Sequence, residues 1–235
     1  MPFSFAESYE YIKVIGKNQP PDEFIIDYIN WGGFPLRFSF SKESDIKRYL
    51  EQTYLGILDR DIITDKSKIN RQNFEKIAGY IMANAGKEFS SKNIQSYFEN
   101  QNEEGLDRKT IYRYLDKMDK ACLIDRVKRF NIVGKQAMSY IEKQYAVDTG
   151  FRMINTNLVN FEDTFFLENI IYNELVSRDY EVFTGKTYKG EIDFVAIYGR
   201  KKCFIQVAYY LGSRETIERE FGAFKPMKRC VTTTK

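Results

Sequence analysis

Two neighbouring segments near the C-terminus combine strand-like apolar alternation with isolated polar residues. Residues 191–197 alternate apolar side chains with Glu191 and Asp193, and residues 202–208 carry Gln206. A polar side chain in apolar surroundings costs free energy unless it is paired or bound. An acidic helix residue, Glu168, precedes both strands. Acids on a helix and a strand can converge on a divalent metal that activates water and stabilises charge on a phosphodiester.

A second candidate site is basic. Residues 105–144 hold ten basic and five acidic side chains, a local net charge of +5, whereas the whole chain carries only +3. Basic residues on a helix and on a following ribbon neutralise phosphates and release counterions. We therefore predict a nucleic-acid contact, although a solvated helix face or a protein-docking face would have the same composition. The predicted contact residues are Arg108, Lys109, Tyr112, Arg113, Lys117, Arg126, Lys128 and Arg129.

The elements around the basic residues indicate three helices and then a ribbon. Apolar residues recur at helical spacing over 74–82, Ser90 or Ser91 can begin a second helix, and Asp107 is the expected N-cap of a third. Two extended stretches follow, 123–130 and 138–141, joined near Gly134. This layout is typical of a winged helix-turn-helix.

Composition divides the chain into three expected regions. Residues 1–66 hold four of the five prolines and short helices around 22–30 and 42–61. Residues 67–144 form the expected winged helix, and 145–235 alternate strands and helices. The predicted fold class is therefore mixed α+β: a helical N-terminal segment and winged helix, followed by an α/β domain.

Several classes of protein are excluded by composition. The chain has no histidine, which removes Ser-His and Cys-His hydrolases and histidine-ligated zinc or haem. Its three cysteines form no Cys-x-x-Cys knuckle and indicate a reducing compartment. No apolar run approaches the roughly 20 residues that cross a bilayer. We expect a cytoplasmic protein with no membrane partner and no cofactor required for folding.

The order of acids in residues 168–208 resembles the PD-(D/E)XK nuclease fold. In that resemblance Asp193 and Gln206 match the magnesium ligands, and Glu168 matches a first-helix acid of resolvase-like members. The implied catalytic residues are Asp193, Gln206 and Glu168, and the implied ligands of Mg or Mn are Asp193, Gln206 and Glu191. The motif lysine is replaced by Ala208, so an inactive or weakly active domain is favoured.

A wider series of motifs looks like the C-terminal part of a prokaryotic AAA+ type P-loop ATPase family. The matching motifs include residues 1–7, Trp31 to Pro35, 58–62, 110–115 and 145–152. Family members have a P-loop module, then a winged helix, then a nuclease-like domain. The ATP site of the family precedes the stretch that begins this chain, so we expect no ATP site and no ATPase activity from the chain alone.

Three functions follow as hypotheses. The first is a nucleic-acid-binding accessory region of the parent ATPase, with DNA as the partner and a nuclease-like domain of little or no activity. The second is a magnesium-dependent endonuclease acting on DNA. The third is a module that binds the parent ATPase or another protein. The residue at position 208 distinguishes the first hypothesis from the second. The net charge of +5 over residues 105–144 distinguishes the first from the third.

Overall fold

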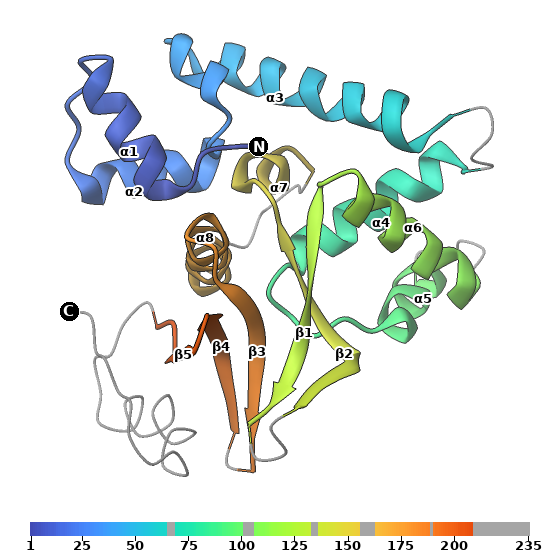
Figure 1. Cartoon of the computed structure of the whole chain (residues 1–235). Helices are drawn as coiled ribbons and strands as arrows, with labels where there is room; N and C mark the ends of the chain where they lie inside the picture. Colours follow the sequence, from blue (N-terminus) through green and yellow to red (C-terminus); the bar gives the residue numbers. More distant parts are fainter. Residues whose placement is uncertain (65–68, 101–105, 133–135, 156–162, 189, 209–235) are drawn as a thin grey trace. The chain divides into compact units, whose positions relative to one another are not determined.

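The computed structural model describes residues 1–64, 69–100, 106–132, 136–155, 163–188 and 190–208 (Figure 1). The chain forms two compact units. Unit 1 comprises Met1–Arg126 and Gln144–Phe161, and unit 2 comprises Val127–Lys143 and Glu162–Lys235. Two of the three boundaries between the units therefore fall inside strands, which are β1 (Ile124–Asn131) and β2 (Gln136–Ala146). Among the described helices, none is long and apolar enough to cross a membrane.

Unit 1 begins with helices α1 (Phe5–Val14), α2 (Pro21–Trp31) and α3 (Glu43–Ile57), the short helix η1 (Pro35–Ser39) between α2 and α3, and η2 (Leu58–Ile62) after α3. The sequence predicted α2 and α3 but not α1. The start of α1 is fixed by a capping box in which Ser4 and Glu7 satisfy each other's backbone N–H groups. Proline at the first position starts α2, where a missing N–H group costs nothing.

The three predicted middle helices are present as α4 (Arg71–Ala83), α5 (Ser91–Asn100) and α6 (Arg108–Lys120). Each presents an apolar stripe to one core, which also takes residues from α3, η2 and the start of β1. The largest side chains in this core include Phe74, Phe98 and Tyr114. Strands β1 and β2 follow α6 directly, as the sequence indicated.

A buried carboxylate joins two segments of unit 1 that are far apart in the sequence. Asp148 precedes α7 (Thr149–Asn155) and accepts the Gly33 N–H at 2.7 Å and the Gly150 N–H at 2.8 Å. Gly32 has φ +68° and lies so close to Asp148 that a Cβ atom there would overlap the carboxylate. These residues belong to two motifs that are far apart in the sequence, and the fold brings them into contact. We call Gly32, Gly33, Asp148 and Gly150 the Asp148 clasp.

Unit 2 contains a mixed sheet of five strands among the described residues, in the order β2-β1-β3-β4-β5. Strand β1 pairs in parallel with β3 (Glu181–Thr187), whereas β3, β4 (Gly190–Tyr198) and β5 (Lys201–Ile205) pair antiparallel. Helix α8 (Asp163–Ser177) packs on β3 and β4 (Figure 1). The mixed α+β class is therefore confirmed.

Candidate functional site

Helix α6 is positioned by its cap and its apolar stripe. The Asp107 carboxylate accepts the Thr110 N–H at 2.9 Å and the Thr110 hydroxyl at 2.8 Å, and these bonds hold the pKa of Asp107 below its usual value. Ile111, Leu115 and Met118 are fully buried on the inner face. Because this spacing fixes which face is inside, it also fixes which residues of α6 face solvent.

The outward face of α6 carries four basic side chains. Arg108, Lys109 and Arg113 are exposed and Lys117 is half-buried. None of the four forms an ion pair within the described residues. The Arg108 guanidinium lies 5.5 Å from the centre of the half-buried Tyr112 ring. The predicted basic face of this helix is thus open to a ligand.

The basic residues of β1 are differently placed. Arg126 forms an ion pair with Asp116 of α6, and Arg129 is buried and bonded to Glu191 at 2.8 Å. Only Lys128 of the three is exposed. The sequence prediction treated all three alike. The sequence alone does not show that acidic residues from other elements lie opposite Arg126 and Arg129. The contact of Arg126, Lys128 and Arg129 with nucleic acid stays a prediction.

The structure brings the predicted acid–amide pair together. The β4–β5 ladder ends at the pair Phe194–Ile205, and Asp193 and Gln206 are the next residues beyond it on the two chain segments. The Asp193 Oδ2 atom accepts the N–H of Val207 at 2.7 Å. The joint role of Asp193 and Gln206 stays a prediction, and Ala208 is the last residue that the structure describes after them.

The other two predicted acids lie in ion pairs. Glu191 contacts Arg129 at 2.8 Å and Lys186 at 3.4 Å. Glu168 of α8 is buried and bonded to Lys143 of β2 at 2.9 Å. Within the described residues, no three acidic or cysteine side chains form a group that could hold a metal. The catalytic and metal roles of these residues stay predictions.

The buried Lys143–Glu168 pair gives a stability prediction. The two side chains are only 10% and 5% exposed. Glu168→Ala leaves an uncompensated buried ammonium group, so we expect the free energy of unfolding to fall by about 3–5 kcal/mol. Urea unfolding monitored by circular dichroism measures the loss.

Glu174→Ala is the matched control, because Glu174 forms a more exposed i,i+4 pair with Arg178 on the same helix. This control variant should lose less than about 1 kcal/mol. Equal losses for the two variants would contradict a special role of the buried pair.

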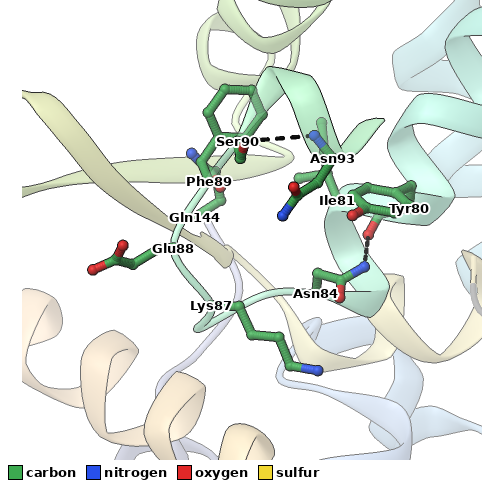
Figure 2. Close-up of a pocket in the computed structure, with 9 residues that line it drawn as sticks. All are labelled: Tyr80, Ile81, Asn84, Lys87, Glu88, Phe89, Ser90, Asn93 and Gln144. Atoms are coloured by element: carbon green, nitrogen blue, oxygen red, sulfur yellow. Dashed lines mark hydrogen bonds between the residues drawn. The ribbon is translucent and has the colours of Figure 1, made fainter. Parts of the chain in front are cut away.

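A small pocket with both polar and apolar lining lies between the end of α4 and the start of α5 (Figure 2). Its volume is about 70 Å³. Asn84 donates to the Tyr80 carbonyl at 2.8 Å, and Ser90 accepts the Asn93 N–H at 3.4 Å. The buried Gln144 amide nitrogen has no hydrogen-bond partner among the described residues. Sequence reasoning missed this pocket because Gln144 lies far along the chain from the rest of its lining.

Two curated proteins are similar to this chain. An uncharacterized protein of Haemophilus influenzae is 27% identical over 215 residues, which are 88% of this chain and 52% of the relative. An uncharacterized protein of Methanocaldococcus jannaschii is 28% identical over 214 residues, which are 86% of this chain and 45% of the relative. The chain thus spans about half the length of the curated relatives it matches. No solved structure matches it.

A family model described as a domain of unknown function, DUF8612, matches residues 22–162. The matched segment begins in α2 and contains the Asp148 clasp, α6, β1 and β2. It covers more than half of the 235 residues. The chain therefore belongs to the DUF8612 family.

Proposed function

We propose that the chain binds duplex DNA through the outward face of α6 and serves as an accessory region of a P-loop ATPase. In this proposal α4, α5, α6, β1 and β2 act as a winged helix, and α6 contacts the major groove. Strands β3, β4 and β5 and helix α8 belong to a nuclease-like domain of the PD-(D/E)XK type with little or no hydrolytic activity.

The observation that carries the proposal is the set of four basic side chains on α6 that form no ion pair within the described residues. A basic side chain that is not held in an ion pair can bind an anionic ligand without first breaking such a contact. Phosphate contacts of this kind supply affinity without sequence information. The proposal therefore names DNA as the partner and no particular site on it.

Ala208 and the two ion-paired glutamates support weak or absent hydrolysis. Glu191 and Glu168 would each have to leave a basic partner before binding a metal ion. Without them, Asp193 is the one predicted ligand that supplies a carboxylate, which is the lower end of the one or two carboxylates that magnesium sites use. The described residues therefore support DNA binding by α6 better than they support DNA hydrolysis.

The test is fluorescence anisotropy of the chain with a labelled duplex over a salt series in EDTA, which prevents metal-dependent cleavage. The logarithm of the binding constant should fall linearly with the logarithm of salt concentration. Arg113→Ala should reduce this slope by about one unit, because one phosphate contact is lost.

Arg48→Ala is the matched control, since Arg48 is an exposed arginine on α3 of the same unit. The control variant should keep the wild-type slope. If the folded wild type does not bind duplex at low salt, or if both variants change the slope equally, the proposal is wrong.

A further inference from the structure

The turn between β4 and β5 forms an exposed basic tip. Gly199 has φ +58°, which allows a two-residue turn of Gly199 and Arg200 between Tyr198 and Lys201. Arg200 and Lys201 are both exposed. Neither forms an ion pair with any residue that the structure describes. Two positive charges therefore project from this end of the sheet in unit 2.

Two tyrosine rings adjoin the tip. Tyr198 is 55% exposed, and the centre of its ring lies 5.6 Å from that of Tyr180 at an interplanar angle of 49°. The β4–β5 register places Lys201 directly opposite Tyr198. The β3–β4 register, continued by one pair, places Tyr180 opposite Tyr198 on the other side. Tyr180, Tyr198 and Lys201 thus form a row across three strands, about 4.8 Å apart.

The row lies on one face of the sheet. Side chains alternate along a strand, so Tyr198 shares its face with Phe194, which contacts Tyr172 of α8. Lys202, by contrast, lies over the Phe130 ring at 4.3 Å and belongs to the opposite face. Glu181 is also on that opposite face, because it is adjacent to Tyr180 in sequence. The exposed Tyr198 ring therefore has the half-buried Tyr180 on one side of it in the row and Lys201 on the other.

We infer that this tip, defined as Tyr180, Tyr198, Arg200 and Lys201, binds single-stranded nucleic acid. The exposed face of Tyr198 stacks on an unpaired base while Tyr180 supports the ring from behind. Arg200 and Lys201 bind the phosphates on either side of that base. Aromatic stacking combined with nearby positive charge is the general chemistry by which proteins hold single strands. A duplex offers this site only phosphates, because its base faces are covered.

The inference goes beyond duplex binding by α6 and uses none of its residues. It is tested by fluorescence anisotropy of the full chain with a labelled oligothymidylate. Tyr198→Ala should weaken binding about tenfold, because one stacked base is lost. Arg200→Glu combined with Lys201→Glu should weaken it further, whereas Tyr198→Ala should bind duplex as the wild type does.

Tyr188→Ala is the matched control for the ring. Tyr188 is 73% exposed in the β3–β4 turn, at the opposite end of β4. This variant should bind the single strand like the wild type. Equal loss in Tyr188→Ala and Tyr198→Ala, or wild-type affinity in Tyr198→Ala, would overturn the inference. So would loss of single-strand binding in an α6 variant with no loss in the tip variants.

Tyr198→Trp supplies a direct signal for stacking. The larger ring keeps the stacking surface, so affinity should stay at least equal to that of the wild type. Its fluorescence, after subtraction of the signal of the single native tryptophan, Trp31, should be quenched as the single strand saturates. Binding without quenching would overturn the stacking role even if affinity were kept.

Discussion

Asp148→Ala is expected to lower the free energy of unfolding by about 3–5 kcal/mol at pH 5, more than any exposed substitution in this chain. The carboxylate is 1% exposed and accepts N–H groups from Gly33 and Gly150. Its removal leaves both donors buried without an acceptor, each at a cost of about 1–3 kcal/mol. Urea unfolding followed by circular dichroism measures the difference.

The loss of stability caused by Asp148→Ala should become smaller as the pH rises. Burial raises the pKa of Asp148 to about 6, against the opposing influence of the Gly33 N–H and of Arg37. The folded state therefore binds the proton more tightly than the unfolded state. The stability due to this proton is fully present below pH 4 and is lost as the pH rises through about 6. The difference between wild type and Asp148→Ala should thus narrow between pH 4 and pH 7.

Asp116→Ala is the control, because Asp116 is 54% exposed and pairs with Arg126 at the surface. It should cost less than about 1 kcal/mol. A comparable loss in the two variants, or a constant difference between wild type and Asp148→Ala over this pH range, would contradict the role assigned to the clasp.

The largest effect on binding is expected from reversing two charges on α6. Arg113→Glu combined with Lys117→Glu should weaken duplex binding at least about 100-fold at low salt, because two phosphate contacts are replaced by two repulsions. The two side chains are four residues apart on the outward face, so they act on the same stretch of DNA backbone. The apolar stripe that includes Ile111 and Leu115 is untouched, and the fold should be kept. Fluorescence anisotropy with circular dichroism measures both quantities.

Lys47→Glu combined with Arg48→Glu gives a control with the same change in net charge. Both residues are exposed on α3, with side chains 60% and 70% exposed. This variant should lose little affinity. Equal losses in the two double variants would mean that the whole field of the chain, and not α6, attracts DNA. Unchanged affinity after the α6 reversal would favour a protein partner for that face.

Features set by residues close in sequence were predictable. The Asp107 cap and the apolar stripe of α6 lie within a dozen residues, and one pattern fixed both the helix and its exposed face. The antiparallel strands β4 and β5 followed from apolar alternation on either side of a short turn. In these cases local propensity and the final fold agree.

Features that depend on distant partners were not predictable. Arg129 lies 62 residues from Glu191, and Lys143 lies 25 residues from Glu168. A basic residue with no acidic residue near it in the sequence can still form an ion pair, because the fold brings a distant acidic residue to it. The parallel pairing of β1 with β3 was also missed, because no local pattern distinguishes a wing strand from a strand of a larger sheet.

The separation between Gly33 and Asp148 has a consequence for how the chain is made. The bond that closes the clasp spans 115 residues. At ordinary rates of translation, the ribosome needs roughly 6 to 23 s to synthesise that length. During this time α1 and α2 are complete, but the carboxylate that locks the Gly32–Gly33 turn does not yet exist. Helices α1 and α2 must therefore wait for a residue that is synthesised much later before their structure is secured.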